Sequence, residues 1–137
     1  MIYITRRERF SAAHRLFNEN WSDSKNFEVY GACSNPNWHG HNYVLKVTVK
    51  GEINPEIGYL CDLKVLSKVI KQYVIDKLDH KNINIEVDFM HGKKVSTENL
   101  AVAIWEQLEP HVKKMDIELH AVLLEETENN FVEYLGN

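Results

Sequence analysis

The sequence has no long apolar run, little glycine and proline, and no surplus of basic residues. No apolar stretch approaches the roughly 20 residues that cross a membrane, and the N-terminal residues lack the apolar core and cleavage site of a signal peptide. With 6 glycines and 3 prolines, no segment has the composition of a linker or low-complexity tail. We therefore expect a soluble, cytoplasmic protein with no membrane partner.

Charge and cysteine content argue against two further classes of protein. The 16 basic and 20 acidic residues give a net charge of −4, whereas proteins that bind a phosphate backbone normally carry a basic surplus. We therefore expect no nucleic acid as a partner. Cys33 and Cys61 could be bridged in principle, but nothing else suggests export, so we interpret them as reduced thiols.

Apolar and polar residues alternate along much of the chain, as is typical of a small globular domain. The 137 residues are enough for one core and too few for two, which predicts a single domain over residues 1–137. Period-2 patterns predict strands. The predicted strands are residues 2–13, 43–53, 117–126 and 131–135, with a short hairpin strand at 59–61.

Two helices are expected between these strands. Asp62 is a suitable N-cap for a helix to about Leu78, and Ser96 for a second helix that Pro110 ends or kinks. The first has an apolar stripe at the 3,4 spacing of a buried face, consisting of Leu63, Leu66, Val69, Ile70, Tyr73 and Val74. Residues 17–32 and 83–95 have no clean period. The order predicts an α+β fold, an antiparallel four-stranded sheet with two helices packed on one face.

One pair of histidines carries the clearest chemical pattern. His39 and His41 are one residue apart, so in a strand both imidazoles project to the same face, and their parity with Leu45 directs them inward. Gly40 between them has no side chain to crowd a bound group. Two imidazoles suit zinc, which needs a third ligand, and His14 is the nearest candidate. Alone, such a pair also fits strand histidines that only meet hydrogen-bond partners.

Five short motifs run in order along the chain. They are Phe-Ser-Ala-Ala-His-Arg-Leu, Cys-x5-His-Gly-His-Asn-Tyr, Leu-Asp-His-Lys-Asn, Ser-Thr-Glu-Asn and Glu-Thr-Glu-Asn-Asn. Together they resemble the 6-pyruvoyltetrahydropterin synthase family and, more loosely, the bacterial 6-carboxytetrahydropterin synthases of queuosine biosynthesis. The similarity extends from about Phe10 to Tyr134, and five motifs in register are far more specific than one.

The resemblance implies an assembly as well as a fold. The family has the tunnelling fold (T-fold), in which three subunits join their sheets into a barrel and two trimers stack into a homohexamer, with active sites at subunit interfaces. This would explain why the motif residues are scattered over more than a hundred positions. It would also pair the edge strands that a lone small sheet leaves open.

The resemblance assigns the metal and proton-transfer roles. His14, His39 and His41 correspond to zinc ligands, and three histidines leave the open fourth position of a catalytic site. Cys33 corresponds to the cysteine that abstracts a proton. The remaining catalytic pair is Asp79 and His80, in which the carboxylate would orient the imidazole. Without the resemblance, that pair would suit a helix end whose dipole favours a histidine.

The resemblance also assigns the substrate contacts. Glu126 corresponds to the glutamate that binds the amino-pyrimidinone edge of the pterin through two N–H groups. Thr97 and Glu98 match a second contact region, although Glu98 also suits the first turn of a helix as a charge. Cys61 matches no motif and is expected only to pack. Candidates for the triphosphate, each also explicable as a solvated charge, are Arg7, Arg15, Lys25 and Lys81.

The implied activity is that of a zinc-dependent lyase that converts 7,8-dihydroneopterin triphosphate to 6-pyruvoyltetrahydropterin with release of triphosphate, a step of tetrahydrobiopterin biosynthesis. The first alternative is 6-carboxytetrahydropterin synthase, which uses the same substrate and releases acetaldehyde. Many members of that branch have Cys-x3-His-Gly-His, so the five residues between Cys33 and His39 favour the pyruvoyl type. The second alternative is a non-catalytic zinc- or pterin-binding protein, which would not need Cys33, Asp79 and His80.

Overall fold

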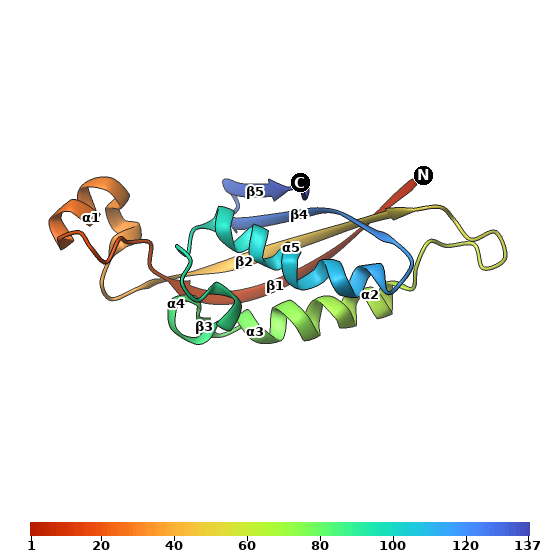
Figure 1. The fold of residues 1–137 in the computed structure, drawn as a ribbon, viewed down its shortest axis with the longest axis horizontal. Helices are drawn as coiled ribbons and strands as arrows, with labels where there is room; N and C mark the ends of the chain where they lie inside the picture. Colours follow the sequence, from red (N-terminus) through yellow and green to blue (C-terminus); the bar gives the residue numbers. More distant parts are fainter.

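The computed structural model describes residues 1–137 as a five-stranded sheet with helices packed on one face (Figure 1). The strands lie in the order β3-β1-β2-β4-β5. Their bounds are β1 Ile2–His14, β2 His39–Gly51, β3 Lys81–Asn82, β4 Glu118–Thr127 and β5 Asn130–Tyr134. The four longer strands are antiparallel neighbours, which confirms the predicted α+β fold, and the two-residue β3 adds a parallel partner to β1.

The helices follow the capping signals of the sequence. They are α1 Asp23–Tyr30, α2 Leu63–Ile70, α3 Asp76–Leu78, α4 Ile83–Glu86 and α5 Thr97–Lys113, with the 3-10 turns η1 Gly31–Ser34 and η3 Asp88–Met90. The π-helical turn η2 Lys71–Ile75 joins α2 to α3, so the predicted helix up to Leu78 is confirmed as one continuous rod. Asp62 accepts the amide N–H of Lys64 at 2.8 Å, and Ser96 accepts that of Asn99 at 3.1 Å.

Several local predictions are wrong. Residues 59–61 form no strand, because both edges of β2 are already paired with β1 and β4. Residues 23–30 form α1 within the segment predicted to be irregular. Pro110 does not end helix α5, which continues to Lys113, because the lost backbone N–H lies on the exposed side of the helix; of the two predicted effects of this proline, only the end is wrong. Leu63 is 43% exposed rather than buried, because it occupies the first position of α2.

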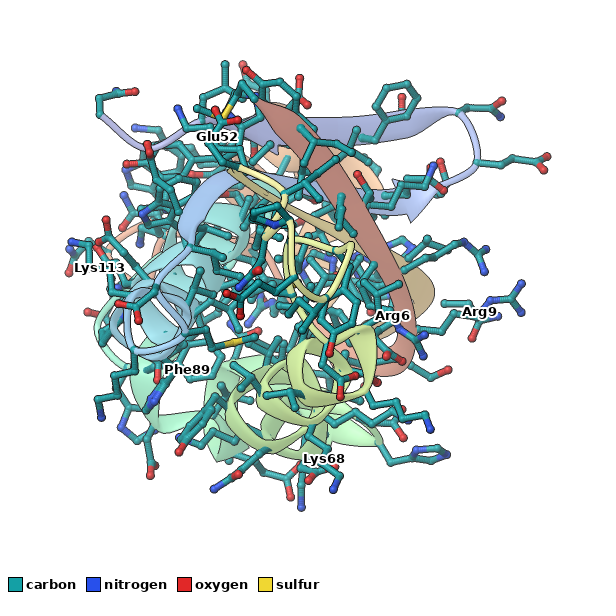
Figure 2. All side chains as sticks on the ribbon, turned by 90° about the vertical axis from the view of Figure 1, so that its right-hand side faces the viewer. Arg6, Arg9, Glu52, Lys68, Phe89 and Lys113 are labelled. Atoms are coloured by element: carbon teal, nitrogen blue, oxygen red, sulfur yellow. The ribbon has the colours of Figure 1, made fainter.

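The core lies between the sheet and the layer of helices. Every second residue of β2 is buried against it, from Tyr43 through Leu45 and Val47 to Val49, as the predicted alternation requires. In the end-on view of Figure 2, Arg9 extends away from the side that the helices cover, whereas Phe89 packs against the core. His39 and His41 therefore share the inner face of β2. None of the helices has the length and apolar character to span a bilayer.

We predict that Leu45→Ala lowers the free energy of unfolding by about 2–5 kcal/mol, because it leaves a cavity beneath a side chain that is 0% exposed. The matched control is Lys46→Ala on the opposite face, which loses only a partly exposed ion pair with Glu125 and should change stability by less than about 1 kcal/mol. Urea unfolding measures both. Equal losses would contradict the assignment of the inner and outer faces.

Candidate functional site

The pairing of β1 with β2 brings three histidines together. In this antiparallel register His14 lies opposite His39, and Ala12 lies opposite His41. The ring centroids are 4.4 Å apart for His14 and His39, 5.2 Å for His14 and His41, and 4.9 Å for His39 and His41. One ligand atom from each ring lies within 4.8 Å of the others, so the three residues are placed to hold a metal ion.

Hydrogen bonding and burial prepare these imidazoles as ligands. The Nδ1 atom of His14 lies 2.8 Å from the carbonyl oxygen of Val95, and because a carbonyl only accepts, Nδ1 must donate and Nε2 keeps its lone pair. Burial lowers the pKa of all three histidines, with the neighbouring imidazoles lowering it further, which favours the neutral ring. The free nitrogens are buried without a partner: His14 Nε2, both ring nitrogens of His39, and His41 Nε2. Three neutral imidazoles, each with a ring nitrogen that makes no hydrogen bond, fit zinc.

Gly40 does not face the space between the rings of His39 and His41. It lies on the outer face of β2, where an added Cβ would meet only the carbonyl oxygen of Ala12, at an ordinary 3.5 Å. The histidine cluster therefore does not require a glycine here, and the predicted reason for Gly40 is wrong.

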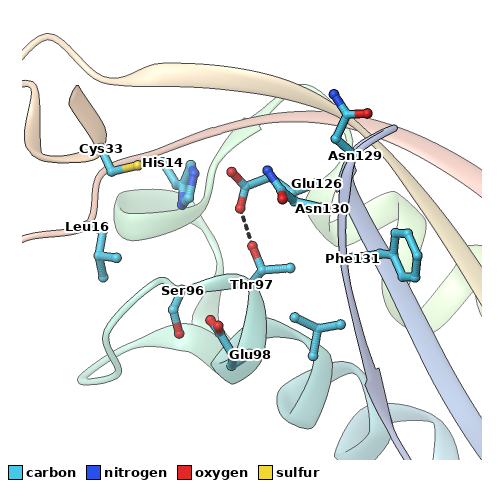
Figure 3. Close-up of a pocket in the computed structure, with 11 residues that line it drawn as sticks. His14, Leu16, Cys33, Ser96, Thr97, Glu98, Glu126, Asn129, Asn130 and Phe131 are labelled. Carbon is cyan, nitrogen blue, oxygen red and sulfur yellow. Dashed lines mark hydrogen bonds between the residues drawn. The ribbon is translucent and has the colours of Figure 1, made fainter. Parts of the chain in front are cut away.

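A pocket of about 500 Å³ opens beside the cluster (Figure 3). It brings together one metal-ligand candidate, the predicted cysteine and all three predicted substrate contacts, namely His14, Cys33, Glu126, Thr97 and Glu98. The hydroxyl of Thr97 donates to Oε2 of Glu126, while Oε1 of Glu126 lies 3.2 Å from Nε2 of His41. The strands and α5 thus bring a fixed carboxylate next to the cluster.

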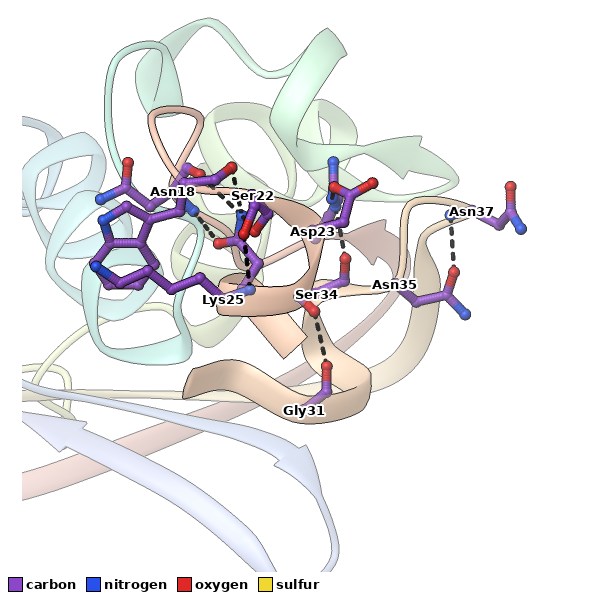
Figure 4. Close-up of polar contacts among 11 residues, drawn as sticks. Asn18, Ser22, Asp23, Lys25, Gly31, Ser34, Asn35 and Asn37 are labelled. Atoms are coloured by element: carbon purple, nitrogen blue, oxygen red, sulfur yellow. Dashed lines mark hydrogen bonds and ion pairs between the residues drawn. The ribbon is translucent and has the colours of Figure 1, made fainter. Parts of the chain in front are cut away.

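The predicted cysteine is held in the pocket by a folded loop. Cys33 lies in η1, where its carbonyl accepts the amide N–H of Leu16 at 2.9 Å, and Figure 3 shows its sulfur directed toward His14. The buried side chain of Asn26 ties the loop together by accepting from the amide N–H of Asn18 at 2.7 Å and donating to the carbonyl of Asn18 at 3.0 Å. Figure 4 shows Asn18 and Ser22 among the polar contacts of this loop. Sequence periodicity could not reveal this loop, because its contacts are polar and local.

The triphosphate candidates do not line this pocket. Arg15 is engaged internally, with Nε donating to the carbonyl of Ser34 at 2.8 Å and its guanidinium 4.0 Å from the ring centre of Phe17. Lys25 lies over the ring of Trp21 at 4.3 Å. The other two, Arg7 and Lys81, line hollows elsewhere on the chain.

The predicted acid and base do not line the pocket that holds Cys33. Asp79 accepts the amide N–H of Ser11 at 2.9 Å and lies 2.9 Å from Nδ1 of His80, and these two contacts, Ser11 first, lower the pKa of Asp79. The side chain of His80 is 84% exposed and lines a second hollow, together with Ser11, Asn42 and His41 of the cluster. Within one chain, Asp79 and His80 are therefore in contact, and His80 lines a different hollow from the one that Cys33 lines.

Comparison with known proteins decides the family. A family model described as 6-pyruvoyl tetrahydropterin synthase matches residues 3–137. The chain belongs to this family. It is 44% identical over 135 residues to the 6-pyruvoyl tetrahydrobiopterin synthase of Dictyostelium discoideum, covering 98% of this chain and 96% of that protein. For the Homo sapiens protein of the same name the identity is 42% over 133 residues, with 97% and 90% covered.

A solved structure agrees with the sequence relatives. The 6-pyruvoyl tetrahydropterin synthase of Caenorhabditis elegans matches with a TM-score of 0.91 and 39% identity, covering 99% of this chain and 96% of that one. These matches confirm the resemblance to the 6-pyruvoyl tetrahydropterin synthase family, the fold that it implied and the expectation of an enzyme of this family.

In this family member, sequence reasoning missed two features of the site. The tip of the β4–β5 hairpin lines the pocket with Asn129 and Asn130, the last residues of the fifth motif, to which no role was assigned. Tyr43, to which the predicted strand 43–53 assigned no role, carries a buried hydroxyl without a partner, and its ring lies 5.6 Å from that of His41. The available signal was its spacing, because residues 41 and 43 of a strand share a face.

We predict that the purified protein binds one zinc ion per chain and that His14→Ala or His39→Ala weakens binding at least about 100-fold, since each removes one of three ligands. His120→Ala is the matched control, because that imidazole packs against Tyr3, outside the cluster. Calorimetric titration of metal-free protein measures the affinity. Full zinc affinity in His14→Ala, or its loss in His120→Ala, would contradict this assignment.

Proposed function

We propose that the protein is a zinc-dependent lyase that converts 7,8-dihydroneopterin triphosphate to 6-pyruvoyltetrahydropterin and releases triphosphate. The observation that supports this most is that one pocket holds a metal-ligand candidate, a thiol and a fixed carboxylate, in His14, Cys33 and Glu126. Relatives that the chain matches over 90% or more of their own length carry the name of this activity. The chain contains no glycine-rich nucleotide loop, which suits a reaction that needs no nicotinamide.

The three histidines His14, His39 and His41 would hold the zinc ion, which supplies Lewis-acid polarisation of the substrate's side-chain oxygens. Because the chain offers three imidazoles at this point, a position remains for substrate. The Nδ1–H of His14, held by the carbonyl of Val95, fixes the ring and its tautomer.

Glu126 would bind the amino-pyrimidinone edge of the pterin. A carboxylate has about four lone-pair sites, so the hydrogen bond from Thr97 leaves capacity for two N–H groups of the ligand. The Thr97 hydroxyl fixes the orientation of the carboxylate before a ligand arrives. Glu98, which lines the same pocket from the first turn of α5, would make a second contact.

Cys33 would take a proton from the bound side chain of the substrate. The thiolate is the basic form of cysteine, and the sulfur is directed into the pocket near His14. The tie between the Cys33 carbonyl and the amide of Leu16 holds η1 against the end of β1, so the thiol keeps a fixed distance from the histidine that β1 carries.

The Asp79–His80 pair would act in the site of a neighbouring subunit. In its own chain His80 is 84% exposed and lies on the outer side of the sheet. The edge of β1 beyond its two-residue contact with β3 is open, and so is the outer edge of β5. A homohexamer made of two trimers, with sheets joined edge to edge, would close these edges and bring His80 of one copy toward Cys33 of another.

The alternative product is 6-carboxytetrahydropterin, with release of acetaldehyde, as in queuosine biosynthesis. The five residues between Cys33 and His39 favour the pyruvoyl product, as do the names of the relatives. We place the reaction in the cytoplasm, where the two cysteines would remain reduced thiols.

We predict that zinc-loaded protein releases triphosphate from 7,8-dihydroneopterin triphosphate without acetaldehyde, and that Cys33→Ala lowers kcat at least about 100-fold through loss of a proton acceptor. Cys61→Ala is the matched control, because that thiol does not line the pocket. Assays for triphosphate and for acetaldehyde follow the products. Acetaldehyde would favour the carboxy-type synthase, and undiminished turnover by Cys33→Ala would contradict the role of the thiol.

We predict that Cys33→Ala and His80→Ala chains, each inactive alone, regain activity when co-expressed as mixed oligomers. If each site takes Cys33 from one copy and His80 from another, about one quarter of the sites are intact. Two affinity tags isolate the mixed species before assay. If both residues acted within one chain, every chain would carry a defect and the mixture would stay inactive.

A further inference from the structure

The buried polar atoms without partners gather around one place in the molecule. Five buried side-chain nitrogen and oxygen atoms have no hydrogen-bond partner. Four of them are ring nitrogens of the three clustered histidines, and the fifth is the hydroxyl oxygen of Tyr43. Because buried polar groups in folded proteins are nearly always paired, the feature that indicates the metal centre also singles out Tyr43.

The ring of Tyr43 is held firmly beside the histidines. Tyr43 is 1% exposed, and its ring stacks on Phe10, its register partner on β1, with centroids 4.8 Å apart and planes at 12°. Its edge contacts lead to the cluster, with centroid distances of 5.6 Å to His41 and 6.3 Å to His14. Packing on both sides leaves the hydroxyl little freedom to find a partner elsewhere.

The hydroxyl is available as a donor. An ordinary phenol has a pKa of about 10, so the hydroxyl carries its proton at neutral pH. No group of the folded chain accepts that proton within hydrogen-bond geometry. A phenylalanine at position 43 would make the same apolar contacts, as Phe10 does on the opposite strand. A hydroxyl buried here without an acceptor is unfavourable unless it gains one.

We propose that Tyr43 is a positioning residue whose hydroxyl donates a hydrogen bond to an oxygen that enters the site with its ligands. That oxygen is either a water carried by the metal ion or a side-chain hydroxyl of the pterin. A water on the metal ion requires only the histidine cluster, whereas a pterin hydroxyl rests on the proposed function as well. In both cases the bond exists only in the loaded protein, and it orients the oxygen relative to Cys33 and Glu126.

Tyr43→Phe tests this inference, because it removes the hydroxyl and keeps the ring. In metal-free protein the variant should unfold at the same temperature as wild type or a higher one, since it removes an unpaired buried group. Zinc affinity, measured by competition with a chelator, should fall about tenfold if the acceptor is a water on the metal. Tyr73→Phe is the matched control, because Tyr73 stacks on His111, far from the cluster, and it should leave zinc affinity unchanged.

The second arm titrates neopterin into zinc-loaded protein, followed by calorimetry. If the acceptor is a pterin hydroxyl, Tyr43→Phe should keep zinc affinity and lose about tenfold in neopterin affinity. The inference is overturned if both affinities equal those of wild type. It is also overturned if the variant destabilises metal-free and loaded protein equally, because the hydroxyl would then have a partner in the folded chain itself. Neither arm measures turnover, so an inactive wild type would disprove the proposed lyase without altering the zinc result.

Discussion

The register between β1 and β2 is the constraint on which the site depends. It sets His14 opposite His39 and, four positions along, Phe10 opposite Tyr43 on the same inner face. A slip of one residue would turn every side chain of one strand to the other face and separate the imidazoles. The long inner row of buried residues on β2 makes such a slip costly, because it would expose the core. Core packing and the histidine cluster therefore specify the same alignment.

The sheet order then adds the remaining groups. β4 pairs with the other side of β2, so Glu126 near its end arrives beside His41, and the first turn of α5 supplies the hydroxyl of Thr97 to hold it. Cys33 comes from a polar loop tied to the end of β1. Groups separated by more than ninety positions thus meet because three adjacent strands end at one place. His80 is the exception, since its side chain faces outward.

The sequence could predict the parts of this arrangement that depend on local rules. Strand parity gave the shared face of His39 and His41, and the capping residues Asp62 and Ser96 gave the helix starts. It could not give β3, whose two residues are strand only because they lie against β1, or α1, whose order comes from the buried Asn26 rather than an apolar stripe. Spacing likewise could not show that His80 faces away from Cys33, because that depends on which face of the sheet a neighbouring segment reaches.

Three imidazoles from two paired strands are placed to hold one metal ion. X-ray absorption at the zinc edge of the loaded protein measures its ligands directly. We expect three imidazole nitrogens at about 2.0–2.1 Å and one further oxygen ligand, without sulfur. A sulfur scatterer at about 2.3 Å would make Cys33 a ligand instead of a base and contradict the account. So would a zinc ion that coordinates fewer than three imidazoles.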